Sequence, residues 1–147
     1  MFFLGIDGGG TKTAFLLINE NGDIIEAKTI ATVSYKHVGM DNSIALLKET
    51  VHEILNDREA YICLALPNWG ESKDGDGEFL SRIKEITELP VKIVNESVVG
   101  WAGSLGLSSG INLVAGTGSI AYGRNDAGEE IGRASCRARV FGYVEFS

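Results

Sequence analysis

The chain has 147 residues, 44% of them hydrophobic, and a formal net charge of −7. This length and apolar content suffice for about one domain with a single core. The acidic balance and the lack of a basic patch argue against nucleic acid or an anionic membrane as a partner, and no apolar stretch approaches transmembrane length.

The first part of the chain predicts three strands followed by a helix and a strand. The strands cover residues 2–6, 13–18 and 23–31 and are joined by tight turns. Asp41 or Asn42 is expected to cap the helix, which carries apolar residues at helical spacing up to residue 55. Residues 61–66 form a continuous apolar run, which is typical of a strand covered on both faces, so we expect Cys63 to be buried.

The second part predicts a loop over residues 67–77, a helix over about 78–88, a strand over 91–94 and a small-residue helix over 97–107. Within that last helix, Gly100, Gly103 and Gly106 favour close helix packing. A new hairpin opens at Gly110. This order predicts an α/β fold with a mixed sheet and flanking helices, and a second unit that is unfinished because two strands cannot bury an apolar face alone.

The first glycine-rich turn covers residues 5–13 and reads Gly-Ile-Asp-Gly-Gly-Gly-Thr-Lys-Thr. Glycines permit positive φ and close approach to a ligand, and successive amides make an anion-binding concavity. Asp7 follows the first strand, and Mg²⁺ binds phosphates through few carboxylates and several waters. These residues predict a site for the phosphate chain of a nucleotide.

The second turn reads Ala115-Gly116-Thr117-Gly118-Ser119 and lies between two apolar runs. Two such loops in one short chain favour a function, although each is also compatible with an ordinary hairpin turn. The Walker A motif is excluded for the first turn, because Thr11 stands where that motif needs lysine and a strand is expected to follow.

Three motifs in sequence order carry a family resemblance: residues 7–13, residues 94–96 (Val-Asn-Glu) and residues 115–119. They resemble the N-acetylglucosamine kinase-like members of the BadF/BadG ATPase family, within the actin and hexokinase superfamily, over about residues 1–130. The resemblance implies a ribonuclease-H-like, actin-like ATPase lobe over residues 1–107, with a mixed five-stranded sheet. Residues 108–130 would be the first hairpin of a truncated second lobe.

The resemblance also implies an ATP-dependent carbohydrate kinase, in which a sugar hydroxyl attacks the γ-phosphate of ATP in a cleft between two lobes. Asp7 would serve Mg²⁺, and residues 97–107 would connect the lobes. The two phosphate loops would comprise Gly8, Gly9, Gly10, Thr11, Lys12, Thr13, Gly116, Thr117, Gly118 and Ser119.

Glu96 occupies the position of the general base in such kinases, where the family more often has aspartate. The extra methylene moves the carboxylate by about one bond length, a change to which rate is sensitive. The alternative is a carboxylate that only stabilises the helix dipole.

Two segments are expected to face the sugar: residues 34–39, with Ser34, Tyr35 and Gly39, and residues 67–71, with Trp69 and Glu71. An indole can stack on a sugar ring, and a carboxylate accepts hydrogen bonds from hydroxyls. Ser34 matches a position where N-acetylglucosamine kinases commonly present asparagine. The alternative for both segments is a surface turn.

Residues 131–147 depart from the family pattern and concentrate three of the chain's six arginines in ten residues. The run resembles the translation of a sequencing adapter, which suggests a truncated gene; the alternative is a basic terminal peptide that docks on the acidic body. A chain without the second lobe is expected to have little activity, because closure of the cleft excludes water.

Two other functions stay open: the ATPase activator of a 2-hydroxyacyl-CoA dehydratase, and a non-catalytic module that binds nucleotide or sugar. The activators share an iron-sulfur cluster across a dimer, for which this sequence shows no convincing ligands. For the kinase we expect a small-molecule sugar as partner. We also expect a cytoplasmic location, because Cys63 and Cys136 suit a reducing compartment. Whether the full-length parent forms a homodimer stays open.

Overall fold

The computed structural model describes residues 1–67, 69–115 and 119–136, without the side chains of 115, 119 and 131–136. It divides into two compact units, Met1–Glu96 and Ser97–Ser147. Each unit contains one sheet. The lobe boundary expected after residue 107 stays a prediction.

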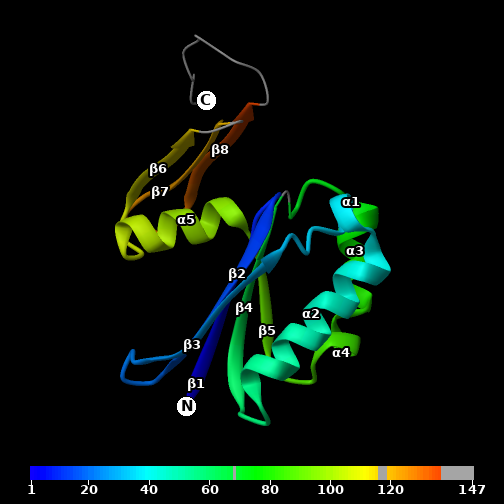
Figure 1. The fold of residues 1–147 in the computed structure, drawn as a ribbon. Coiled ribbons are helices and arrows are strands. Elements are labelled where there is room, and N and C mark those ends of the chain that lie inside the picture. The colour runs from blue at the N-terminus through cyan, green and yellow to red at the C-terminus, as the bar shows by residue number, and fades with distance from the viewer. Residues whose placement is uncertain (68, 116–118, 137–147) are drawn as a thin grey trace. The chain divides into compact units, whose positions relative to one another are not determined.

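The first unit is built on a mixed sheet in the order β3-β2-β1-β4-β5 (Figure 1). β1, β2 and β3 pair antiparallel, whereas β1, β4 and β5 run parallel. The expected mixed five-stranded sheet is therefore confirmed. Its strands are β1 (Phe2–Gly8), β2 (Lys12–Asn19), β3 (Ile24–Ala31), β4 (Ala60–Leu66) and β5 (Val91–Asn95).

The register aligns the carboxyl ends of the three parallel strands. Asp7 of β1 pairs with Ala65 of β4, and Ala65 in turn pairs with Val94 of β5. Segments that leave these strands therefore begin at one edge of the sheet. In open α/β sheets this edge is where ligands bind.

Four helices lie on one face of this sheet (Figure 1). They are α1 (Tyr35–Val38), α2 (Met40–Leu55), α3 (Lys73–Ser81) and α4 (Ile83–Ile86). The predicted apolar spacing of α2 is confirmed, and its buried stripe packs on alternate residues of β1, β2 and β4. The predicted cap at Asp41 or Asn42 is wrong: the helix begins at Met40 after Gly39, and the Asn42 side chain instead donates to the carbonyl of Val38 at 2.9 Å. The core contains Leu4, Ile6, Phe15, Leu17, Ile44, Leu47, Val51, Ile54, Ile62, Leu64, Leu66 and Phe79.

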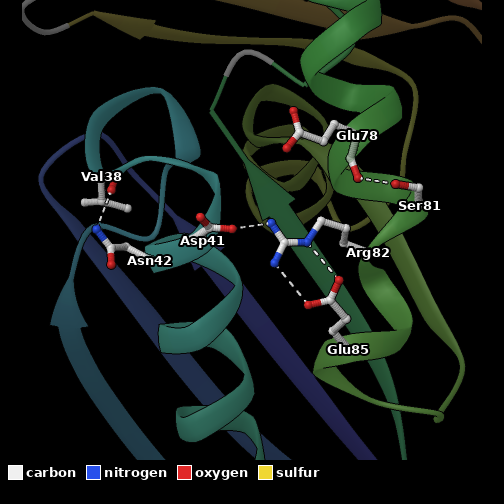
Figure 2. A network of polar contacts seen from close by, with 7 residues as sticks. All are labelled: Val38, Asp41, Asn42, Glu78, Ser81, Arg82 and Glu85. Atoms are coloured by element: carbon white, nitrogen blue, oxygen red, sulfur yellow. Dashed lines mark hydrogen bonds and ion pairs between the residues drawn. The ribbon is translucent and has the colours of Figure 1, made fainter.

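The loop expected over residues 67–77 and the single helix over 78–88 are wrong. Helix α3 begins at Lys73, where the Ser72 hydroxyl accepts a hydrogen bond from the amide of Gly75 at 3.4 Å, and two acidic residues in the first turn suit the helix dipole. The helix stops at Arg82, whose φ of −101° and ψ of 1° separate α3 from α4. The guanidinium of Arg82 contacts Asp41 of α2 and Glu85 of α4 (Figure 2).

The burial of Cys63 is also predicted wrongly, since its side chain is exposed. The helices of the first unit cover one face of the sheet, so β4 alternates between buried and exposed residues from Ala60 to Leu64, and only its last three residues are all buried. On the other face Phe3 and Tyr61 stack at 6.2 Å between ring centroids, with 40% and 53% of their surfaces exposed. The continuous apolar run is therefore covered on both faces only at its carboxyl end, and on one face over residues 60–64.

The second unit contains α5 from Ser97 onward and a three-stranded antiparallel sheet in the order β6-β7-β8. The ranges are α5 (Glu96–Leu105), β6 (Gly110–Ala115), β7 (Ser119–Arg124) and β8 (Glu130–Cys136). The predicted hairpin is confirmed as β6 and β7. The additional strand β8 includes residues 131–136 of the atypical tail.

Packing explains only one of the three glycines of the small-residue helix. A Cβ on Gly100 would lie 2.9 Å from Nδ2 of Asn112, whereas a Cβ on Gly103 would meet nothing within 4 Å. Gly106 follows the helix with a φ of 56°, in the left-handed region that ends helices. Across the described residues, the longest and most apolar helices fall short of what is needed to cross a membrane.

Candidate functional site

The first glycine turn is the connection of the β1–β2 hairpin, and residues that follow β3 hold it. The amide of Gly9 donates to the carbonyl of Lys12 at 2.9 Å. The Thr32 hydroxyl donates to the carbonyl of Gly9 at 2.7 Å, and the Thr32 amide donates to the carbonyl of Thr11 at 3.1 Å. The turn is thus held by a hydrogen bond within its own hairpin and by two hydrogen bonds from Thr32, which follows β3.

Gly8, Gly9 and Gly10 are not explained by positive φ, because none of them adopts it. That expectation is wrong, and for Gly8 and Gly9 the physical reason for glycine is close approach of backbone. A Cβ on Gly8 would lie 2.7 Å from the carbonyl oxygen of Ala65, and one on Gly9 would lie 3.1 Å from that of Lys12.

The polar side chains of this turn differ in exposure. Asp7, Thr11 and Lys12 are exposed, whereas Thr13 is 0% exposed. The Thr13 hydroxyl accepts a hydrogen bond from the amide of Val33 at 3.0 Å. Thr13 therefore ties the start of β2 to the segment after β3, and its hydroxyl is already used inside the protein.

Three carboxylates from separate segments interact at the carboxyl edge of the parallel strands. Asp7 ends β1, Glu71 lies in the connection after β4, and Glu96 directly follows β5. Burial raises the pKa of Glu96 above the ordinary glutamate value of 4.5, and the negative charges of Asp7 and Glu71 raise it further. The half-buried Glu96 therefore accepts a proton more readily than a solvated carboxylate.

This arrangement suits proton abstraction and binding of a hard cation. A carboxylate with a raised pKa matches the requirement of a general base near neutral pH. Among the residues that the structure describes, no group of three or more His, Cys, Asp or Glu side chains is arranged to hold a metal ion. Mg²⁺ needs no such cage, since it binds through one or two carboxylates, waters and phosphate oxygens.

The residues expected to face the sugar come from two segments that both contact Phe79. The Tyr35 ring lies 5.8 Å from Phe79 between centroids, and the Trp69 ring lies 6.1 Å away in an edge-on arrangement. Trp69 is half-buried and Glu71 is exposed. The structure thus makes neighbours of two segments that are far apart in sequence.

The polar groups of the segment after β3 are largely occupied by protein partners. Ser34 is 2% exposed and its hydroxyl lies 3.0 Å from Nδ1 of His37. The Tyr35 hydroxyl donates to Asp76 at 2.6 Å. Gly39 has a φ of 82°, which permits the sharp connection between α1 and α2.

Sequence reasoning missed Asp76, and it included Asn95 in a motif without assigning it a role. Asp76 accepts hydrogen bonds from the amides of Gly70 and Ser72, and Nδ2 of Asn95 donates to the carbonyl of Trp69 at 2.9 Å. A signal for Asp76 was present, because a serine followed by acidic residues marks the start of a helix.

The second glycine turn is only partly within the described structure. Gly116, Thr117 and Gly118 lie outside the described residues, and of Ser119 only the backbone is described, paired with Ala115 where β6 and β7 meet. The phosphate-binding role of this turn stays a prediction.

Comparison with known proteins shows the family of the chain and names its relatives. Residues 4–132 match the model of the BadF/BadG/BcrA/BcrD ATPase family. The N-acetyl-D-glucosamine kinase of Dictyostelium discoideum is 30% identical over 145 residues, which cover 86% of this chain and 44% of the relative. The chain spans about half the length of the curated relatives it matches.

Solved structures show the same fold at lower identity. A protein of Chromobacterium violaceum assigned as an N-acetylglucosamine kinase aligns with a TM-score of 0.73 at 21% identity, over 97% of this chain and 50% of that one. MreB5 of Spiroplasma citri, bound to ADP, aligns with a TM-score of 0.62 at 16% identity, over 92% and 52%. These likenesses confirm the actin-like ATPase fold expected from the sequence. With most of its length matched by the family model, the chain belongs to the BadF/BadG/BcrA/BcrD ATPase family.

Proposed function

We propose that the chain is the N-terminal part of an ATP-dependent sugar kinase that phosphorylates a sugar hydroxyl. Family membership and a relative named N-acetyl-D-glucosamine kinase support this, and N-acetylglucosamine is the sugar to test first. The observation that carries the proposal is Glu96, a half-buried carboxylate with a raised pKa beside Asp7 and Glu71.

In this mechanism Glu96 takes the proton of the attacking sugar hydroxyl. The hydroxyl oxygen forms a bond to the γ-phosphorus of ATP, the bond from that phosphorus to the β–γ bridging oxygen breaks, and ADP leaves. Phosphoryl transfer depends mainly on positioning and charge neutralisation, so the base must lie within hydrogen-bond reach of the hydroxyl.

Asp7 would hold Mg²⁺. Its exposed carboxylate at the end of β1 is a hard oxygen donor, and the neighbouring turn of Gly8–Lys12 is open to solvent at its tip. When bound, the ion would neutralise charge on the phosphate oxygens. The amides of Gly9 and Gly10, with Thr11 and Lys12, are the proposed contacts to the phosphate chain.

The proposed sugar contacts are Trp69 and Glu71, with Ser34, Tyr35 and Gly39 from the segment after β3. The exposed Glu71 carboxylate would accept hydrogen bonds from sugar hydroxyls. The partly exposed Trp69 would offer an apolar ring face. A cytoplasmic location is part of this proposal, since ATP and reduced cysteines both suit that compartment.

The test uses a polypeptide that carries this sequence and extends to the length of its relatives. ADP release is measured with Mg-ATP against a panel of N-acetylglucosamine, N-acetylmannosamine, glucosamine and glucose. We expect release that depends on an acetylated amino sugar, with one phosphorylated sugar formed per ADP. Hydrolysis that ignores the sugar would favour the activator ATPase, and binding without product would favour a non-catalytic module.

The Glu96→Gln variant tests the base. We expect kcat to fall by about a hundredfold or more while sugar affinity is kept, because general-base catalysis contributes on that scale. Glu78→Gln is the matched control, since Glu78 is an exposed glutamate on α3. Full activity of Glu96→Gln would exclude Glu96 as the base.

A further inference from the structure

The Asp76 carboxylate connects two segments that are separated by more than thirty residues. Oδ1 accepts a hydrogen bond from the Tyr35 hydroxyl at 2.6 Å. Oδ2 accepts from the amide of Gly70 at 2.8 Å and from the amide of Ser72 at 3.4 Å. One side chain of α3 therefore holds both α1 and the connection after β4.

Packing around Asp76 leaves the Tyr35 ring little freedom. A Cβ on Gly75 would lie 3.0 Å from Cε2 of Tyr35 and 3.4 Å from its hydroxyl oxygen. The ring therefore lies directly against the glycine, at the start of α3. The Tyr35 ring also packs against the ring of Phe79, which is fully buried. The phenol is thus held in one place for its bond to Asp76.

The segment Trp69–Ser72 depends on these bonds for its shape. Gly70 has a φ of 88°, so this stretch is not part of a regular strand or helix. The bonds from the amides of Gly70 and Ser72 to the carboxylate are charge-assisted, which makes them stronger than bonds between neutral groups. Burial and the neighbouring Asp76 raise the pKa of Tyr35, so its phenol stays a donor at physiological pH.

We propose that Asp76 is a positioning residue that fixes Trp69 and Glu71 for the sugar, and that Tyr35 acts through Asp76 without using its hydroxyl on the sugar. This inference rests on the proposed sugar-kinase function. A rigid support is needed because displacement of a binding group by about 1 Å is enough to lose much of its effect.

The test compares Asp76→Asn and Tyr35→Phe with a matched control, all made in the extended polypeptide used to test the function. Asp74→Asn is the control, since Asp74 is an exposed aspartate in the same turn of α3. N-acetylglucosamine binding is followed by calorimetry, and Mg-ATP binding by the NMR shifts of the Gly9 and Gly10 amides. The NMR shifts of the Gly70 and Ser72 amides report their hydrogen bonds to Asp76, and thermal unfolding reports the stability of each variant.

We expect Asp76→Asn to weaken sugar binding by about tenfold, since it weakens charged hydrogen bonds. Tyr35→Phe should weaken it less, and Asp74→Asn should leave it unchanged. The response of Gly9 and Gly10 to Mg-ATP should be the same in all variants. If Asp76→Asn does not fold, the Tyr35→Phe variant tests the proposal instead. It should show a smaller loss of sugar affinity, together with altered NMR shifts of the Gly70 and Ser72 amides.

Sugar affinity equal to wild type in both variants would overturn the positioning role. Equal losses for sugar and Mg-ATP would also overturn it, since they would indicate general destabilisation. If the extended polypeptide without substitutions binds Mg-ATP but no sugar of the panel, the proposed function is refuted instead, and the two failures are therefore distinguishable.

Discussion

Gly8 and Ala65 approach each other so closely that a Cβ on Gly8 would lie 2.7 Å from the carbonyl oxygen of Ala65. The contact joins the end of β1 to its parallel neighbour β4, at the edge of the sheet where the three carboxylates meet. A side chain here must displace backbone, which cannot rotate away as a flexible side chain can.

Gly8→Ala is therefore expected to lower the free energy of unfolding by about 1–3 kcal/mol, the usual range for overpacking. Gly77→Ala is the control, because a Cβ there would meet nothing within 4 Å and Gly77 lies inside α3. It should raise stability by up to about 1 kcal/mol through helix propensity. Urea unfolding measures both, and equal stability of the two variants would contradict the steric argument.

Thr13→Val removes a hydroxyl that the buried amide of Val33 needs. The expected loss is about 1–3 kcal/mol, since an unpaired buried donor loses its solvation without replacement. Thr13→Ser should lose less because it keeps the oxygen, and the exposed Thr11→Val should change stability by less than about 0.5 kcal/mol. Thermal unfolding measures the series. A stable Thr13→Val chain would show that the hydroxyl is free for another role.

The raised pKa of Glu96 makes stability depend on pH in a defined direction. The folded chain binds this proton more tightly than the unfolded chain, so stability falls as pH rises from the ordinary value of 4.5 through the folded pKa. Glu96→Gln does not titrate and should be more stable than wild type at neutral pH and equal to it in acid. Urea midpoints across pH measure the difference, and a gap that narrows as pH rises would contradict the assignment.

The Arg82 contacts predict that Glu85 makes stability depend on pH in the opposite direction. Hydrogen bonds from Arg82 lower the pKa of Glu85 below its ordinary value of 4.5. The stabilisation is present above that value and is lost as pH falls through the folded pKa. Glu85→Gln should therefore lower the urea midpoint at neutral pH, and the loss should disappear in acid.

High salt should reduce the difference in urea midpoint between wild type and Glu85→Gln, because Glu85 is an exposed ion-pair partner of Arg82 (Figure 2). Glu88→Gln is the control: it breaks the exposed Lys84–Glu88 pair, which lies within one segment and does not involve Arg82. A larger effect of Glu88→Gln than of Glu85→Gln would show that the Arg82–Glu85 pair adds little to stability.

Local sequence was enough to predict the strands β1, β2, β4 and β5, the helix α2, and the glycine turn between β1 and β2. Apolar periodicity and turn residues act over a few neighbours and can be read without the fold. The position of Glu96 after a strand and at the start of a helix was predictable for the same reason. The resemblance added the order in which these elements assemble.

Tertiary structure decided what local patterns leave open. The apolar run of β4 does not show how many faces are covered, so Cys63 was expected inside and is exposed. The reason for Gly8 is a carbonyl that lies 57 residues away in the chain, and the partners of Asp76 include Tyr35, 41 residues away. Contacts of this kind arise only when the sheet register and helix packing bring distant backbone together, which no short window of sequence records.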